Sequence, residues 1–152
     1  MSKTRFHFIS NWHVAAPTDA AFDCLSDPAA LSDWWPGFRT ARTETAPTPV
    51  GRAARIEVRS IPPIVLRFEL RIVSAAQNQE LGAVARGDLE GSARVQFGAA
   101  ETGTRITFDW DVTLERPWLR PLSSALRPLF VFSHELMMRR GERGLNEFLR
   151  SD

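Results

Sequence analysis

The chain of 152 residues contains no tyrosine, a single cysteine and only three histidines. Without tyrosine, no phenol side chain can act as an acid in any site. Because Cys24 has no second cysteine to pair with, an internal disulfide is excluded, which fits a reducing compartment. The histidines, His7, His13 and His134, do not combine with Cys24 in the spacing of a zinc or haem site. We therefore expect no metal.

Long apolar runs are also missing from the sequence. No stretch approaches the roughly 18 apolar residues that a membrane-spanning helix needs, so we expect no membrane span. The first residues, MSKTRFHF, lack the apolar core of a signal peptide. Together these absences predict a cytoplasmic protein.

The charge is close to balanced, with 19 lysines and arginines, 18 aspartates and glutamates, and a net charge of +1. Acidic residues are interleaved with the basic ones, which gives no electrostatic argument for nucleic acid or an anionic membrane as a partner. Gly141-x-x-Gly144 falls inside an expected helix and is no phosphate-binding loop, so no cofactor is expected. Apolar residues form 43% of the chain, enough for the core of one domain over residues 1–152.

Within the C-terminal segment 117–152, the unbroken stretch LFVFSHELMMRRGERGLNEFLR predicts one long helix. Apolar residues recur at every third or fourth position, interrupted by a single imidazole. This stripe consists of Leu126, Phe130, His134, Met137, Gly141, Leu145 and Phe148. The solvent-facing side is expected to carry Arg139, Arg140, Glu142, Arg143, Glu147 and Arg150. Pro128 fits the first turn, where no N–H is needed, and the apolar stripe requires a sheet or bundle beneath it.

The residues upstream supply that sheet. Apolar and polar residues alternate over 5–15, 52–59, 65–74, 89–97 and 104–114, with weaker candidates at 38–45 and 79–86. A period of two is typical of strands with one buried face, and short links between consecutive strands predict an antiparallel meander. Two short helices follow the first strand, one starting at Pro17-Thr18-Asp19 and one at Asp27-Pro28 that ends before Pro36.

Several local motifs occur along this order of elements. They are Trp12-His-Val-Ala-Ala-Pro17, Asp27-Pro28 followed by Trp34-Trp35-Pro36, Pro117-Trp118-Leu119-Arg120, and His134-x-x-Met137 leading to Gly141-x-x-Gly144-Leu145. In this order the chain resembles the START-like (SRPBCC) helix-grip superfamily and, within it, the bacterial-type polyketide cyclase/dehydrase family. The resemblance implies an α+β fold in which an antiparallel sheet of about seven strands wraps around the C-terminal helix. It also implies a cavity between them for a small apolar or aromatic ligand.

His134 is the one ionisable group on the apolar stripe. It could act as a general acid or base in the cavity, or donate a hydrogen bond to a ligand carbonyl. It could equally be a neutral core histidine bonded to a sheet carbonyl. The neighbours Ser133 and Glu135 cannot complete a hydrolytic triad with it, because consecutive helical residues point about 100° apart.

Aromatic residues are concentrated on the expected inner side of the sheet and helix. They could stack on a flat ligand or simply pack as core. With Met137 and His134, the candidate ligand-binding residues are Trp12, Trp35, Phe38, Phe68, Phe97, Phe108, Trp110 and Phe130. Trp34 belongs to the same inward aromatic group.

Two further features favour structural roles. Asp109 and Asp111 lie two apart on a strand, opposite Phe108 and Trp110, and so are expected on the wet face as partners of Arg94 or other arginines. The segment Ile61-Pro62-Pro63-Ile64 predicts a rigid hairpin tip that could form the lip of a cavity.

Three functions are compatible with these observations. The first is a small-molecule carrier or sensor with an apolar cavity. The second is a cyclase or dehydratase that holds a poly-β-ketone-like chain while His134 moves a proton. The third is a protein-interaction domain with a fully packed interior.

Overall fold

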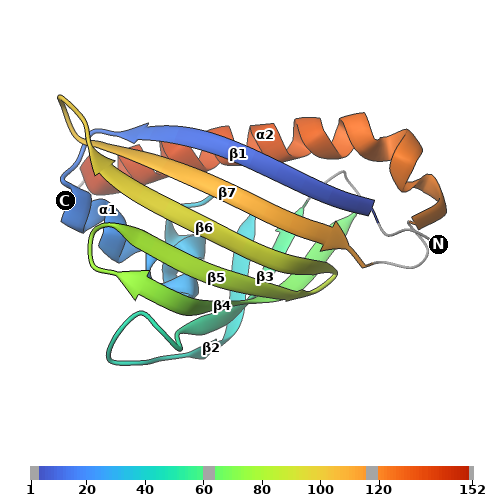
Figure 1. Ribbon diagram of the computed structural model, residues 1–152, viewed down its shortest axis with the longest axis horizontal. Helices are drawn as coiled ribbons and strands as arrows, with labels where there is room; N and C mark the ends of the chain where they lie inside the picture. The colour runs from blue at the N-terminus through green and yellow to red at the C-terminus, as the bar shows by residue number, and fades with distance from the viewer. Residues whose placement is uncertain (1–3, 60–63, 116–119, 151–152) are drawn as a thin grey trace.

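The computed structural model describes residues 4–59, 64–115 and 120–150 (Figure 1). The elements are β1 (Thr4–Val14), α1 (Thr18–Leu25), a 3-10 helix η1 (Pro28–Asp33), β2 (Phe38–Glu44), β3 (Ala53–Arg59), β4 (Val65–Ala76), β5 (Glu80–Gly87), β6 (Leu89–Ala99), β7 (Thr104–Leu114) and α2 (Arg120–Arg150). The predicted order of a strand, two short helices, six strands and a long helix is confirmed. The hairpin tip at Ile61-Pro62-Pro63 and the motif Pro117-Trp118-Leu119 lie outside the described residues.

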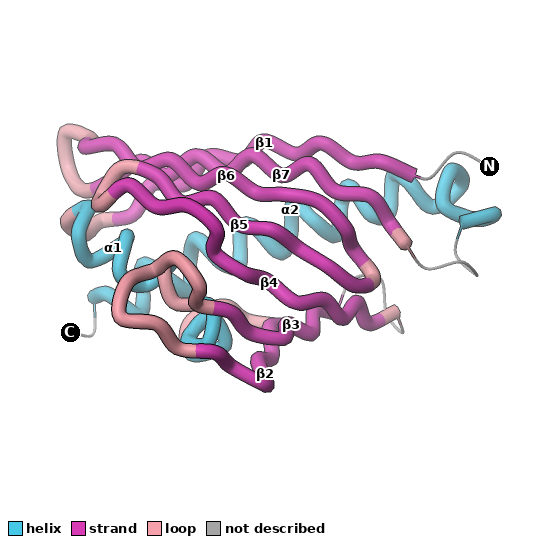
Figure 2. The backbone as a smooth tube through the Cα atoms, turned by 60° about the horizontal axis from the view of Figure 1, so that its bottom comes forward, coloured by secondary structure: helices cyan, strands magenta, loops and turns pink. Residues whose placement is uncertain are grey.

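The strands form one seven-stranded sheet in the order β1-β7-β6-β5-β4-β3-β2, with every neighbouring pair antiparallel. The sheet bends from β1 round to β2, while α2 runs beside β1 on the inner side (Figures 1 and 2). This is the expected α+β helix-grip architecture. Within the described residues no helix is both long and apolar enough to cross a membrane.

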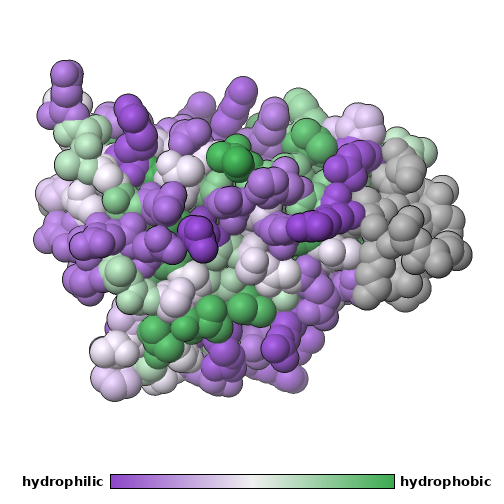
Figure 3. Space-filling view, in the orientation of Figure 1, coloured by the Kyte–Doolittle hydropathy of each residue, from purple (hydrophilic) through white to green (hydrophobic). Residues whose placement is uncertain are grey.

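Strand alternation places the apolar side chains inside. In β1, Phe6, Trp12 and Val14 are buried, and opposite them in β7 lie Val112, Ile106 and Thr104. The intervening residues face outward, so the outer surface of the sheet is largely hydrophilic (Figure 3). The period-two pattern therefore fixes which face of the sheet meets α2.

Helix α2 docks on a layer of tryptophans through two glycines. A Cβ at Gly141 would lie 2.5 Å from Cε2 of Trp35 and 2.7 Å from Cζ2 of Trp12. A Cβ at Gly144 would collide with the carbonyl oxygen of Trp34. The Trp35 indole N–H donates to the Met137 carbonyl oxygen at 3.0 Å. Only glycine permits this close approach of a helix to bulky rings.

The buried stripe of α2 differs from the predicted one at its C-terminal end. Phe130, Met138 and Leu145 are buried and Leu149 packs on the main core, whereas Phe148 is 36% exposed. The prediction of Phe148 as a core residue was therefore wrong. Steps of four residues from Gly141 lead to Leu145 and Leu149, and this continues the inner face of a helix with 3.6 residues per turn.

The sequence predicted Pro128 in the first turn of the long helix, and this prediction was wrong. The helix begins at Arg120, so the proline is inside it. Because proline has no N–H and its ring clashes with the carbonyl four residues earlier, it bends a helix. Figure 1 shows the first turns of α2 running at an angle to the rest of the helix.

Neither edge strand of the sheet presents a regular, free row of backbone hydrogen-bonding groups along its whole length. At β1, the Glu142 carboxylate accepts the His13 backbone N–H at 2.7 Å, and the Asn146 amide accepts from the Ala15 N–H at 2.8 Å. Asn146 Nδ2 also donates to the His13 carbonyl at 3.0 Å. Glu142, expected on the solvent side, is thus half-buried against β1.

At the opposite edge, the pairing of β2 with β3 is interrupted between Ala41 and Glu44. Arg42 lies in this bulge with φ of 46°. A non-glycine residue with positive φ is uncommon and marks a local break in the regular ladder.

Candidate functional site

The inner face of the sheet and α2 border an apolar cavity of about 90 Å³ that is partly open to solvent. Helix α2 contributes Phe130, Ser133, His134 and Met137 to its wall, and the strands contribute mainly phenylalanine, leucine and valine side chains. The cavity exists because the sheet curves away from the helix on this side of the tryptophan layer. Its lining contains few polar groups, among them His134, Ser133, Arg59 and the indole of Trp110.

His134 is held in the cavity wall by stacking. Its ring lies on that of Phe8, with the centroids 3.8 Å apart and the planes 10° from parallel. Burial lowers the pKa of His134 from 6.5 to about 4, because the charged imidazolium is poorly solvated there. Among the described residues, Nε2 has no hydrogen-bond partner. At neutral pH the ring is therefore uncharged.

A second cavity of about 50 Å³ lies between η1 and the middle of the sheet. Phe38, Phe68 and Trp110 line both cavities. These three side chains therefore form a partition between the two spaces. An engineered closed apolar cavity of roughly 150 Å³ holds benzene; the main cavity is smaller but partly open to solvent, so a ring can also occupy its mouth.

The residues predicted to bind a ligand fall into three groups. Those that line the main cavity are Phe38, Phe68, Trp110, Phe130, His134 and Met137. Trp35 and Phe108 line the second cavity, with Phe38, Phe68 and Trp110.

The third group lines neither of these two cavities. Trp12 packs against Trp35, with centroids 5.0 Å apart, and Phe97 packs edge-on against Phe22 at 5.3 Å. Both are buried core residues, which matches the packing alternative stated for the aromatic set. An inward position on a strand therefore indicates a core residue more reliably than a cavity-lining residue.

The main cavity also contains residues that the sequence did not single out. Phe6, Phe8, Leu66 and Val112 line it from β1, β4 and β7. Their alternation placed them inward, so the signal was present, but nothing distinguished them from other core positions. Arg59 at the end of β3 lines the cavity although the alternation placed it outward.

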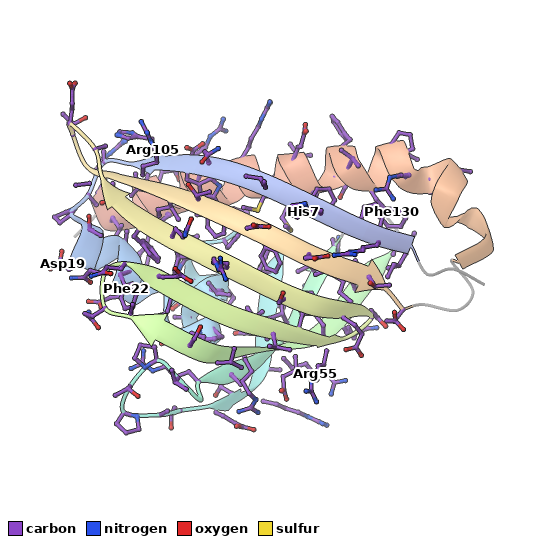
Figure 4. The ribbon with its side chains drawn as sticks, viewed as in Figure 1. His7, Asp19, Phe22, Arg55, Arg105 and Phe130 are labelled. Atoms are coloured by element: carbon purple, nitrogen blue, oxygen red, sulfur yellow. The ribbon has the colours of Figure 1, made fainter. Side chains whose placement is uncertain are left out.

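The carboxylates of β7 lie on the outer face, as expected. Asp111 accepts from Arg5 Nε at 2.8 Å and from Nη2 at 2.5 Å, and Asp109 contacts His7 Nε2 at 2.7 Å. The pKa of Asp111 is lowered mainly by its hydrogen bond with Arg5. The suggested partner Arg94 instead pairs with Glu80 at 3.2 Å. Figure 4 shows His7 on this outer side.

The remaining polar candidates do not assemble into a site. Ser133 lines the main cavity, whereas Glu135 is exposed beside a surface groove with Arg139. His13 Nε2 contacts the carbonyl oxygen of Thr102. Across residues 4–59, 64–115 and 120–150, no three His, Cys, Asp or Glu side chains are grouped to hold a metal ion.

A curved seven-stranded antiparallel sheet that grips a long C-terminal helix around an apolar space defines the helix-grip class of proteins. Residues 5–141 match the family described as polyketide cyclase / dehydrase and lipid transport. The chain belongs to this family. No match is found among curated proteins.

Solved structures support the fold at low sequence identity. The protein TTHA0849 from Thermus thermophilus is similar with a TM-score of 0.78 and 14% identity, over 93% of this chain and 95% of that one. The di-domain ARO/CYC protein BexL gives a TM-score of 0.70 and 16% identity, over 94% of this chain and 49% of BexL. StfQ, a di-domain ARO/CYC from the steffimycin biosynthetic pathway, gives a TM-score of 0.66 and 13% identity, over 95% of this chain and 52% of StfQ. The chain thus spans about half of each di-domain protein.

Proposed function

We propose that the protein binds a small apolar or aromatic molecule in the cavity between the sheet and α2, as a carrier or sensor. The observation that supports this most directly is a partly open space of about 90 Å³ between the sheet and α2, with a wall that is almost wholly apolar. A well-packed interior leaves few voids larger than a water molecule. Displacement of weakly bound water by an apolar ring, together with burial of the ring, would drive binding.

A cyclase or dehydratase is the second candidate, favoured by the family and by the likeness to ARO/CYC proteins. It would use His134 as the acid or base. The geometry supports this role less well, because general acid–base catalysis is most effective with a pKa near the working pH. Burial lowers the pKa of His134 to about 4, so at pH 7 the ring is a weak base and carries no proton to donate as an imidazolium.

A domain that acts only through protein contacts is the third candidate. It requires an interior without room for a ligand. The two spaces beside Phe68 and Trp110 argue against this.

Binding can be tested with toluene by ligand-observed NMR and by thermal unfolding. We expect saturable binding and a rise in the unfolding temperature with toluene concentration. Val112 lines the cavity, so Val112→Phe should fill it and abolish both effects. Ile9 is 62% exposed, and Ile9→Phe adds a ring of the same size outside the cavity as a matched control. No binding by the wild type would refute the proposal.

The enzyme alternative needs a separate comparison. His134→Ala is assayed for ligand affinity and for turnover of aromatic polyketide precursors. If the substitution changes affinity only slightly and the wild type shows no turnover, the binding function stands alone. Turnover by the wild type that disappears in His134→Ala would favour the enzyme instead.

A further inference from the structure

Two side chains that line the main cavity each carry a buried ring nitrogen without a hydrogen-bond partner among the described residues. These nitrogens are Nε1 of Trp110 and Nε2 of His134. A buried polar group without a partner is costly, and each instance in a native protein requires an explanation. A ligand atom that pairs with them is one such explanation.

Trp110 differs from the other tryptophans in this respect. The indole of Trp35 donates to the Met137 carbonyl. Trp12 and Trp34 also lack hydrogen-bond partners, but their rings meet edge to face at 6.1 Å and neither lines the main cavity. Within the described part of the chain, the indole of Trp110 has neither a hydrogen bond nor a ring contact with another aromatic side chain. Its N–H is therefore the donor most in need of a ligand.

The two nitrogen-bearing rings flank the same side chain. Phe8 is the direct cross-strand partner of Trp110 in the β1–β7 pair, and the Phe8 ring stacks on His134 at 3.8 Å. Cross-strand partners on one face of a sheet lie about 5 Å apart at Cβ. The indole of Trp110 and the imidazole of His134 are thus both neighbours of Phe8.

The dimensions of the cavity limit what can occupy it. Its volume is about 90 Å³ and it is partly open to solvent, so a single ring would fill the space and part of its mouth, given that an engineered closed cavity of roughly 150 Å³ holds one benzene. Phe38, Phe68 and Trp110 separate it from the second space of about 50 Å³. A long folded chain or a fused ring system therefore cannot span both spaces without movement of this partition.

We infer that the ligand is a single aromatic ring carrying a hydroxyl group, bound with its oxygen at the Trp110 indole N–H and beside the imidazole of His134. This inference rests on the proposed binding function. An indole N–H can only donate a hydrogen bond, whereas Nε2 of a neutral imidazole donates in one tautomer and accepts in the other. A hydroxyl can accept and donate, so it suits Trp110 and either tautomer of His134. A methyl group of the same size suits neither.

Phenol and toluene test this inference, because they differ only in a hydroxyl for a methyl group. Toluene is the more hydrophobic of the two and would bind more tightly to a cavity that offered only apolar contacts. We expect Trp110→Phe, which removes the N–H and keeps an aromatic ring, to weaken phenol about tenfold, as for the loss of one buried hydrogen bond. Toluene affinity should stay within about twofold. The matched control is Trp34→Phe, which also removes an unpartnered indole N–H but lies outside the cavity wall, and which should leave the phenol-to-toluene ratio unchanged.

A second variant guards against misfolding of the first. His134→Phe keeps a ring to stack on Phe8 and removes both nitrogens, so it too should lower phenol affinity relative to toluene. If both ligands bind and their ratio is the same in wild type, Trp110→Phe and His134→Phe, the inference is overturned and the binding function survives. If neither ligand binds the wild type, both fail.

Discussion

The close approach of α2 to the tryptophan layer makes Gly141→Ala a decisive substitution. Alanine is favoured over glycine inside a helix by about 1 kcal/mol, so helix propensity alone predicts a more stable protein. The structure predicts the opposite. The new Cβ would lie 2.5 Å from Cε2 of Trp35 and 2.7 Å from Cζ2 of Trp12, about 1 Å closer than carbon atoms normally pack.

Neither ring can move freely to relieve this overlap. Trp35 stacks on Phe38 with centroids 4.4 Å apart and donates to the Met137 carbonyl. Trp12 is wedged against Phe108 at 4.4 Å. Overpacking a core in this way costs about 1–3 kcal/mol, and loss of the indole hydrogen bond costs about 1 kcal/mol more. After the gain in propensity, we expect Gly141→Ala to destabilise the protein by about 1–3 kcal/mol.

Urea unfolding followed by circular dichroism measures this change. With a slope of about 1–3 kcal/mol/M, the midpoint should fall by roughly 1 M and the slope should stay constant. A Cβ at Gly98 would meet nothing within 4 Å, so Gly98→Ala is the control and should not destabilise. Trp35→Phe removes the indole atoms nearest the new methyl, so it should cost less in the Gly141→Ala background than in the wild type. A Gly141→Ala midpoint equal to or above that of the wild type would refute this account of helix docking.

Three more predictions follow from other contacts. Burial lowers the pKa of His134 from 6.5 to about 4. Between these pH values the unfolded chain binds a proton at His134 and the folded chain does not. The free energy of unfolding should therefore fall by roughly 3 kcal/mol as the pH drops from about 6.5 to 4. His134→Phe should lose this part of the pH dependence, and an unchanged profile in urea titrations would contradict it. Asn146 accepts from the Ala15 N–H and donates to the His13 carbonyl, so Asn146→Ala should cost about 1–3 kcal/mol and speed hydrogen exchange at the Ala15 amide. The control Gln77→Ala, in the turn between β4 and β5, should leave that amide unaffected. Phe68 stands between the two cavities, so Phe68→Leu should admit naphthalene, detected by ligand-observed NMR. Phe97→Leu, at a buried position that lines neither cavity, is the control, and binding of naphthalene to the wild type would disprove the partition.

Most of the fold could be predicted from the sequence because its signals are local and repetitive. Alternation in β1 and β7 gave the inner face from Phe6 to Val14 and from Ile106 to Leu114, and Asp27-Pro28 marked the start of the second short helix, where Asp27 does accept the Ala29 N–H. The helix-grip arrangement itself came from the resemblance and not from periodicity. The prediction failed at Pro128, because α2 already begins at Arg120, and at Phe148, because the inner face of the helix follows Leu145 and Leu149.

The candidate site was less accessible to sequence reasoning. Whether an inward aromatic residue lines a cavity or fills the core depends on how far α2 stands from the sheet at that level. Trp12 and Trp110 have the same pattern signal, yet the glycine at position 141 brings α2 down onto Trp12, while Trp110 faces the space beside His134. The contact that sets Trp12 apart joins it to Gly141, more than 100 residues away in the sequence. No local pattern encodes such a contact.

The structure of the two edge strands, β1 and β2, affects how the protein can associate with other molecules. A bare edge strand is a template onto which another chain can add and start a fibril. Here Glu142 and Asn146 already occupy backbone groups at His13 and Ala15, and the bulge at Arg42 breaks the ladder at the far side and presents a charge there. An incoming strand would have to dislodge the helix at one border or straighten a kinked, cationic segment at the other, so neither border is a ready seed for amyloid-like growth.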